Sequence, residues 1–302
     1  MVIPAFNAEK TVAATVRSVL AQRRSCLEIL VIDDGSTDAT AEVAGAMDDA
    51  RVQVIRQANA GPSAARNQGI VAARGRYVSF LDSDDLWLPT YLEAVANRLE
   101  RAAAPGFAYT DAWVFEDRTG RIRSETAMVA PDPPPPDRLA FLHALLARNF
   151  IFTSATVPAV VLEAVGAFDE SLPMAEEYDL WLRIILAGWE AVWVPGPQAL
   201  YRQHAGQLSS QTLTMLSCVA QVLARLDKAT LPTAQLRERL EASRRNVNRE
   251  VAVVSGDAGW ASRRRDVRHW MGRARRSARL TREWMPDAPE AAARTLAELS
   301  AL

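Results

Sequence analysis

Tyr77-Val78-Ser79-Phe80-Leu81-Asp82-Ser83-Asp84-Asp85 joins an apolar run directly to a group of three carboxylates. Strand interiors reject Asp, so this stretch predicts a strand that ends at Leu81 and presents acidic side chains at its carboxyl end. In open α/β sheets, ligands bind at that end. Clustered carboxylate oxygens suit Mg²⁺ or Mn²⁺, which commonly bind together with a phosphate. A solvated turn with an Asp cap for the next helix would need one Asp and not three, so we favour a metal–phosphate site.

The first hundred residues alternate between strand and helix patterns. Strands are expected at 2–6, 28–32, 52–55 and 77–81, and helices at 8–21, 38–47, 63–73 and 89–101. Such alternation is typical of right-handed βαβ units. We therefore predict an α/β fold with three α/β/α layers and a mostly parallel sheet.

The pattern after residue 100 is more mixed. Strands are expected at 107–117, 151–157, 191–194 and 199–203, a hairpin turn at 117–120, and helices at 138–148 and from Glu176. From about residue 209 the sequence is helical and rich in Ala, Leu and Arg. We therefore predict an α/β domain of residues 1–208, which would hold the site at residues 82–85, and a helical, Arg-rich C-terminal region of residues 209–302.

The composition, 49% apolar and 24% charged, is ordinary for a soluble globular protein. No apolar stretch reaches the ~18 residues of a membrane span, and the start lacks the basic region of a signal peptide. Cys26 and Cys218 are far apart, so we expect reduced thiols, with neither a disulfide nor a zinc site. These features predict a cytoplasmic protein.

The net charge of −1 hides an uneven distribution. Residues 1–204 carry 26 acidic and 18 basic groups, whereas residues 205–302 carry 10 acidic and 17 basic groups. Nine of the 17 basic groups in residues 205–302 are arginines between Arg263 and Arg282, in a segment that also contains Trp270 and Met271. A basic helix of this kind can lie on an anionic membrane surface, so one interpretation is peripheral contact at the inner face of the membrane. The other is a solvated helix that packs its Trp on the core. Nucleic-acid binding is not expected, because no base-reading or RNA-stacking motif accompanies the charge.

Four further motifs fall near expected strand ends or helix starts. They are Val-Ile-Pro-Ala-Phe-Asn at 2–7, Asp-Asp-Gly-Ser-Thr-Asp at 33–38, Ala-Arg-Asn at 65–67, and Glu-Glu-Tyr-Asp-Leu-Trp-Leu-Arg at 176–183. Together with residues 82–85, this ordered set resembles the family 2 glycosyltransferases, which have the GT-A fold and invert the anomeric centre. The resemblance covers about residues 1–210. It departs at the start, because the family usually has several more residues of first strand than this sequence, which opens at Met1.

The resemblance implies a role for each matching residue in binding a nucleotide-sugar donor. Asp33 would hydrogen-bond the nucleobase, normally a uracil, and Arg66 would face the nucleotide as a fixed cation. Asp82 and Asp84 correspond to the DxD motif of the family, with Asp84 the more direct ligand of Mn²⁺ or Mg²⁺. His204 is a further candidate for the metal or diphosphate, with a solvent-facing loop residue as the alternative. The remaining residues expected to contact the nucleotide are Pro4, Phe6, Asn7, Glu9 and Ser83.

The acidic pair at 176–177 would supply the base that takes a proton from the acceptor hydroxyl. Family members usually have Glu-Asp there, with the Asp as the base, whereas this chain has Glu176-Glu177. Glu177 is one methylene longer, and we expect it to be the base and to be ionised at neutral pH, favoured by the helix dipole. Asp179 is interpreted as structural.

Three functions compete. The favoured one is an enzyme that moves a sugar, most simply from a UDP-sugar, to a glycan or lipid-linked acceptor, as in bacterial cell-surface polysaccharide synthesis. Glu177 in place of the usual Asp motivates the alternative, a non-catalytic nucleotide-sugar-binding or scaffold protein. A sugar nucleotidyltransferase would need a Gly-rich basic loop after the first strand, which Asn7-Ala8-Glu9-Lys10 is not.

Overall fold

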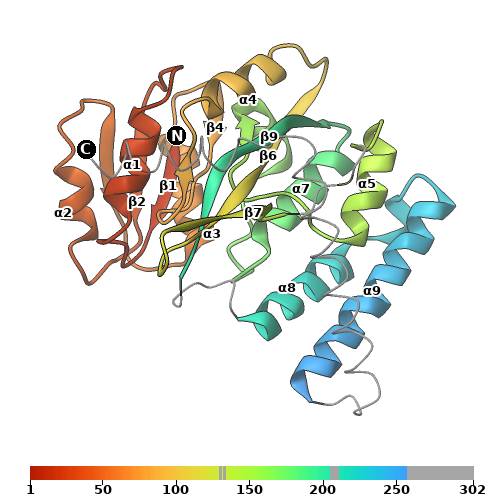
Figure 1. The fold of residues 1–302 in the computed structure, drawn as a ribbon. Helices are drawn as coiled ribbons and strands as arrows, with labels where there is room; N and C mark the ends of the chain where they lie inside the picture. Colours follow the sequence, from red (N-terminus) through yellow and green to blue (C-terminus); the bar gives the residue numbers. More distant parts are fainter. Residues whose placement is uncertain (129–130, 132–133, 205–210, 257–302) are drawn as a thin grey trace.

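The computed structural model describes residues 1–128, 131, 134–204 and 211–256 (Figure 1). Its N-terminal half is a parallel sheet in the order β1-β2-β3, with a helix after each strand. Ala5 pairs with Asp33, and Asp33 pairs with Arg56, so the polar loops after these strands leave the sheet at one edge. The predicted alternation is confirmed by β1 (Val2–Ala5), α1 (Val12–Leu20), β2 (Ile29–Asp33), α2 (Thr40–Gly45), β3 (Val52–Arg56) and α3 (Pro62–Ala72).

A second set of strands continues the sheet on the other side of β1, where Val2 bridges to Phe80. Its order is β4-β8-β6-β9-β5, with β7 paired to β6. β8 runs antiparallel to β4 and β6, whereas β6 and β9 are parallel. The strands are β4 (Tyr77–Ser79), β5 (Leu86–Trp87), β6 (Pro105–Glu116), β7 (Arg121–Thr126), β8 (Thr156–Pro158) and β9 (Glu190–Gln203).

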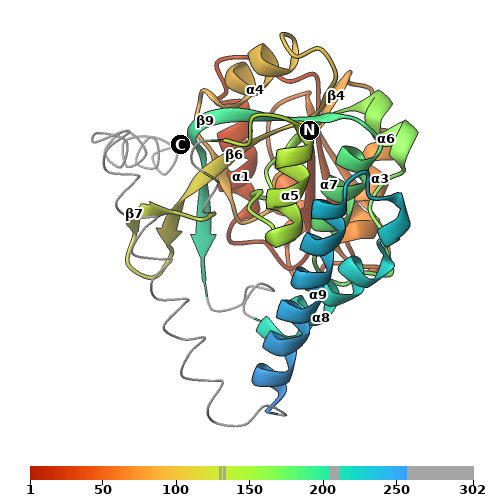
Figure 2. The same ribbon diagram turned by 90° about the vertical axis from the view of Figure 1, so that its right-hand side faces the viewer.

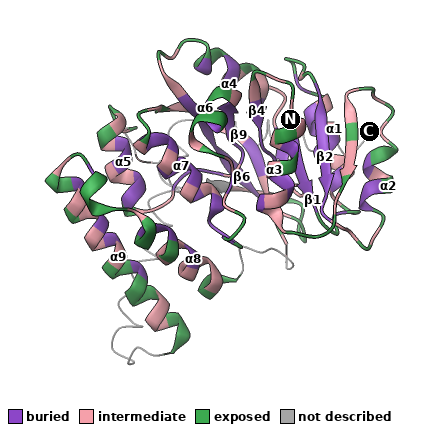
Figure 3. Cartoon of the chain, turned by 180° about the vertical axis from the view of Figure 1, so that it is seen from behind, coloured by how far each residue is buried: buried purple, intermediate pink, exposed green. Residues whose placement is uncertain are grey.

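Helices cover both faces of the sheet, which gives the three predicted layers (Figures 2 and 3). Side chains alternate along a strand, so Ile3 and Val31 pack with α1, while Val2 and Ile32 face the opposite layer. The first layer contains α1, α2 and α4 (Tyr91–Leu99). The second contains α3, α5 (Arg138–Ala147), α6 (Ala159–Val165) and α7 (Glu176–Leu186).

The C-terminal helices pack on the second layer. They are α8 (Thr212–Arg225), a 3₁₀ turn at Lys228–Thr230 and α9 (Ala234–Ser255). Cys218 and Val222 of α8 and Leu240 of α9 belong to the same buried cluster as α5 and α7. The proposed boundary between residues 208 and 209 falls within 205–210, outside the described residues, and so does the Arg263–Arg282 segment with Trp270 and Met271. Within the described part of the chain, no helix is both long and apolar enough to cross a membrane.

Three local predictions differ from the structure. The strands expected at 191–194 and 199–203 are one strand, β9, which continues through Pro195, Gly196 and Pro197 with shifts in its register against β6. The strand expected at 151–157 is limited to β8, and α6 follows it without having been predicted. Seven residues of Ala, Val, Leu and one Glu are too short a helix to be told from a strand by periodicity alone.

Candidate active site

The loops after β1 and β2 are tied to each other by side chains. Asn7 has a left-handed backbone (φ 51), which places its amide oxygen 2.9 Å from the Thr37 N–H. The Ala8 N–H donates to the Thr40 hydroxyl at 2.7 Å, and Glu9 accepts from the Ala39 N–H at 3.2 Å. Asn7 and Glu9 therefore order these two loops, beside the position predicted for a nucleobase.

Asp33 ends β2 as a buried carboxylate. One oxygen accepts the Ser36 N–H at 3.1 Å, and the other accepts Arg56 Nε at 3.2 Å. Pro4 is buried in the adjacent strand, whereas Phe6 is 50% exposed. The side predicted for the nucleobase thus has a fixed carboxylate, Asp33, and an aromatic ring open to solvent, Phe6.

Asp34 has a structural role that the sequence did not reveal. Its carboxylate accepts the N–H groups of Ala60 and Gly61 at 2.9 Å each, and the Gln57 amide at 2.8 Å. These bonds fix the loop that leads into α3. Two consecutive Asp residues at a strand end face opposite ways, which is the signal that could have separated their roles.

The turn after β4 is held by its backbone and by Asp85. Asp85 is buried and accepts the Arg202 N–H at 2.9 Å, while Arg202 Nε donates to the Asp84 carbonyl at 2.8 Å. The Thr15 hydroxyl lies 2.9 Å from the carbonyl oxygens of both Ser83 and Asp85. Burial and the charges of Asp84 and Asp82 raise the pKa of Asp85 well above its usual range. The third carboxylate of the acidic stretch is therefore a structural anchor.

Asp84 and His204 lie side by side although 120 residues separate them. His204 Nε2 is 2.8 Å from Asp84 Oδ2. Burial and Asp82 raise the pKa of Asp84, against the opposing effect of His204. No three His, Cys, Asp or Glu side chains of the described residues form a ready-made metal site. The Asp84 carboxylate nevertheless suits Mg²⁺ or Mn²⁺, and Mg²⁺ usually takes its other ligands from water and phosphate, while His204 is the neighbouring nitrogen donor.

Arg66 of α3 joins the two acidic motifs. Its guanidinium lies 2.7 Å from Asp82 Oδ1, 2.5 Å from Glu176 Oε1 and 3.2 Å from Glu177 Oε1. Burial lowers the pKa of Arg66, but the carboxylates of Asp82, Glu177 and Glu176 outweigh it and raise the pKa. Three acids surround one cation, so this cluster of four side chains carries excess negative charge whenever all three acids are ionised.

Glu177 differs from its sequence prediction in its charge. Its helix starts after Ala175, whose left-handed backbone (φ 60) turns the chain into α7. Burial and Glu176 raise the pKa of Glu177 to about 8, against the opposing effect of Arg66. The expectation of an ionised carboxylate at neutral pH is therefore wrong, because burial and the like charge of Glu176 outweigh the helix dipole. Asp179 bonds Arg183 within the helix at 2.8 Å, in agreement with its structural interpretation.

The structure thus brings Arg66, Asp82, Glu177, Asp84 and His204 to one edge of the sheet. The only contact described for Ser83 in that turn is its backbone carbonyl, which accepts from Thr15. Glu176, Asp85 and Arg202 were not predicted as site residues. Adjacent acids at a helix start were the available signal for Glu176, whereas contacts across more than a hundred residues cannot be seen in a linear pattern.

Comparison with known proteins identifies the family. The family model described as "Glycosyl transferase family 2" matches residues 1–152. The chain is also similar to the UDP-Glc:alpha-D-GlcNAc-diphosphoundecaprenol beta-1,3-glucosyltransferase WfaP of Escherichia coli. The two are 31% identical over 228 residues, which covers 74% of this chain and 84% of the relative. The chain belongs to glycosyltransferase family 2, and it is a glycosyltransferase.

Solved structures confirm the GT-A fold. TarS residues 1–349 of S. aureus, in complex with UDP-GlcNAc, matches with a TM-score of 0.60 at 18% identity, over 82% of this chain and 71% of that one. The mannosyltransferase PcManGT of Pyrobaculum calidifontis, in complex with GDP-Man and Mn²⁺, matches with a TM-score of 0.58 at 16% identity, over 98% of this chain and 85% of that one.

Proposed function

We propose that this chain transfers a sugar, with inversion, from a uridine diphosphate donor to a hydroxyl of a lipid-linked sugar. The observation that carries the proposal is the cluster at Arg66, where one cation holds the acids of both motifs at 2.5 to 3.2 Å. That cluster brings Asp82, from the motif proposed to bind the donor phosphates, next to Glu176 and Glu177, from the motif proposed to supply the base for the acceptor. The name of WfaP supports UDP-glucose as the first donor to test and GlcNAc-diphosphoundecaprenol as the first acceptor.

The donor occupies the edge formed by the loops after β1, β2 and β4. Asp33 accepts a hydrogen bond from the base, beside Phe6, Pro4, Asn7 and Glu9. Asp82 and Ser83 lie on the sugar and phosphate side. Asp84 and His204 would hold Mn²⁺ or Mg²⁺, which when bound neutralises charge on the leaving diphosphate. The 2.8 Å contact between these two side chains supports this assignment.

Glu177 takes the proton from the acceptor hydroxyl. Its oxygen contacts Arg66 at 3.2 Å, whereas Glu176 makes the shorter bond to that cation and stays paired with it. This arrangement of the two acids leaves Glu177 to act as the base, and burial and Glu176 raise the pKa of Glu177 to about 8. A base with a raised pKa accepts a proton more readily once it is ionised.

A non-catalytic nucleotide-sugar-binding protein is the second candidate, favoured by the same raised pKa, because a protonated Glu177 cannot act as a base. Release of UDP from UDP-glucose separates the two functions. It should require both GlcNAc-diphosphoundecaprenol and Mn²⁺ or Mg²⁺, and should stop when EDTA is added. Binding of UDP-glucose without turnover at pH 8 or above would favour the binding protein.

Asp84→Ala is expected to remove the response of UDP affinity to Mn²⁺. Loss of an outer-shell partner alone costs roughly 10–100-fold in metal affinity, so loss of a ligand should cost at least that. Calorimetric titration of UDP with and without Mn²⁺ measures the effect, with Asp49→Ala as a control because that acid pairs with Arg51 just before the start of β3. An unchanged Mn²⁺ response would exclude Asp84 from the metal site.

Asp33→Ala is expected to weaken UDP binding whether or not metal is present. A hydrogen bond to a charged group contributes about 1.5–3 kcal/mol, which corresponds to a loss of roughly ten- to a hundredfold in affinity. Glu42→Ala is the matched control, because Glu42 contacts Arg56 but not Asp33. Equal UDP affinities of the Asp33 variant and the parent would show that the nucleobase of UDP does not bind at Asp33.

A further inference from the structure

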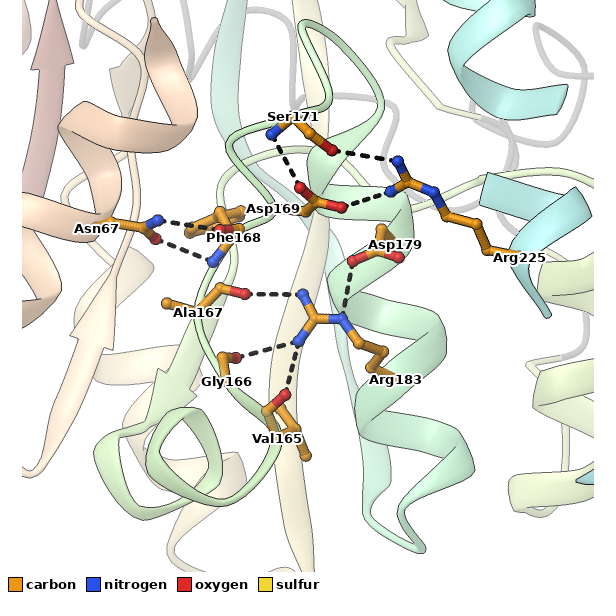
Figure 4. A network of polar contacts seen from close by, with 10 residues as sticks. All are labelled: Asn67, Val165, Gly166, Ala167, Phe168, Asp169, Ser171, Asp179, Arg183 and Arg225. Atoms are coloured by element: carbon orange, nitrogen blue, oxygen red, sulfur yellow. Dashed lines mark hydrogen bonds and ion pairs between the residues drawn. The ribbon is translucent and has the colours of Figure 1, made fainter. Parts of the chain in front are cut away.

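The loop of residues 166–174 leads from α6 to Glu176 and Glu177, and it is fastened by three elements (Figure 4). Its position decides where α7 begins. Three polar side chains hold the loop in place. Asn67 of α3 and Arg183 of α7 bind its backbone, and Arg225 of α8 binds its Asp169 side chain.

Asn67 of α3 fastens the loop next to the acidic cluster. Its amide accepts the Phe168 N–H at 2.9 Å and donates to the Phe168 carbonyl at 2.9 Å and to Glu170 at 2.8 Å. The Phe168 ring packs edge-on against Phe80, and the Arg66 guanidinium lies 5.5 Å from its centre. A shift of this loop would therefore move the Phe168 ring and change the packing around the Arg66 guanidinium.

Arg183 of α7 fastens the start of the loop. It donates to the carbonyl oxygens of Val165, Gly166 and Ala167, and its Nε binds Asp179 at 2.8 Å. These bonds make the loop start and the helix α7 one unit, as Figure 4 shows.

Arg225 of α8 supplies the fastening from the C-terminal helices. It pairs with Asp169 and donates to the Ser171 hydroxyl at 3.1 Å, while Asp169 also accepts the Ser171 N–H at 2.8 Å. The Arg225 and Asp169 side chains are 46% and 33% exposed. A pair this exposed adds little to global stability, so its effect should be local.

We propose that Arg225 is a positioning residue for sugar transfer, which holds the loop of residues 166–174 so that the Glu177 carboxylate reaches the acceptor hydroxyl. This inference rests on the proposed function. It makes α8 part of the acceptor side of the enzyme and gives the C-terminal helices a role in transfer. A displacement of ~1 Å at a reacting group can cost about a hundredfold in rate, so even a partial shift should be measurable.

The test compares four proteins: the parent, Arg225→Ala, the conservative variant Arg225→Lys, which keeps a cation opposite Asp169, and Arg24→Ala as control. Arg24 forms a pair of similar exposure with Glu100, away from this loop. Two measurements are made on each protein. One is hydrogen–deuterium exchange of the peptides that cover residues 165–178, and the other is the steady-state rate with UDP-glucose and GlcNAc-diphosphoundecaprenol.

Arg225→Ala should speed exchange in residues 166–178 and lower kcat for transfer by about tenfold, with the KM for UDP-glucose unchanged. Arg225→Lys should stay close to the parent in both measurements, because it leaves a cation beside Asp169 and leaves the Asp169–Ser171 bond intact, and Arg24→Ala should match the parent. A purely structural pair would leave kcat unchanged or lower it together with donor binding. Parental exchange and parental kcat in Arg225→Ala would overturn the inference. A parent that does not turn over UDP-glucose would instead count against the proposed function, and the exchange data would still test the loop contact.

Discussion

Glu177→Gln is expected to lower the rate of sugar transfer by roughly 10²–10⁴, the usual contribution of a general base. Glutamine keeps the size and hydrogen bonding of the side chain but cannot accept the proton of the acceptor hydroxyl. UDP affinity should stay unchanged, because the proposed donor contacts are made by other residues. Steady-state kinetics with UDP-glucose and GlcNAc-diphosphoundecaprenol, together with calorimetry of UDP binding, measure the two effects separately.

Loss of folding would not explain this result. Burial and Glu176 disfavour the charged form of Glu177, so its pKa is raised and a neutral amide is at least as well tolerated there. The free energy of unfolding of the variant should equal or exceed that of the parent at pH 8. Glu177→Asp restores the usual residue of the family and should keep or increase activity. Parental transfer by Glu177→Gln would move the base to another acid of this helix start, Glu176 or Asp179, although both are paired with an arginine.

The same group predicts the pH dependence of the parent. A carboxyl with a pKa raised to about 8 keeps its proton below that pH, and the protonated form is inactive as a base. The value of kcat/KM should therefore rise from about pH 6 to about pH 8 and level off above it. The residual activity of Glu177→Gln should be flat over that range.

Most of the N-terminal half could be predicted from sequence because its elements are local. Each strand of the parallel sheet is a short apolar run that ends in a polar motif, and each crossover helix has its own periodicity. Beyond β4 the sheet depends on pairing between distant segments, such as β4 with β8 and β6 with β9. Pro195 and Pro197 lack the N–H of a regular ladder, so sequence favoured two strands, whereas pairing with β6 carries β9 through them.

In the candidate site, too, the local motifs could be predicted from the sequence, whereas the contacts between distant residues could not. The motifs placed Asp33, Asp82, Asp84 and Glu177 at loop or helix ends that do converge. The sequence could not indicate that Arg66 would bind acids 16, 110 and 111 positions away. Nor could it indicate the charge of Glu177, because burial and the spacing to Glu176 exist only in the folded chain.

Arg66→Met is expected to destabilise the protein by about 3–5 kcal/mol near pH 8, the usual cost of removing one partner of a buried ion pair. The Arg66 side chain is 4% exposed, and the paired Glu176 side chain is 6% exposed. Methionine fills much of the volume but leaves the carboxylates of Glu176, Glu177 and Asp82 without their shared cation. Urea unfolding at several pH values measures the effect, with Arg24→Met as the control, for which a surface pair should cost at most about 1 kcal/mol.

The deficit of Arg66→Met should narrow as the pH falls. In the parent, the pKa of Glu177 is raised from its ordinary value to about 8, so the folded state holds this proton more tightly than the unfolded state. Its contribution favours folding below about pH 4.3 and is lost as the pH rises to about 8. Arg66 lowers that pKa, so its removal raises the pKa further and increases the cost of an ionised Glu177. Below about pH 7 Glu177 keeps its proton in both folded proteins, so the part of the difference that depends on Glu177 should appear as the pH rises through about 8 and should be largest above it. A deficit that does not change with pH would show that Arg66 stabilises the fold through packing, and that the acids at its side are not held there by charge.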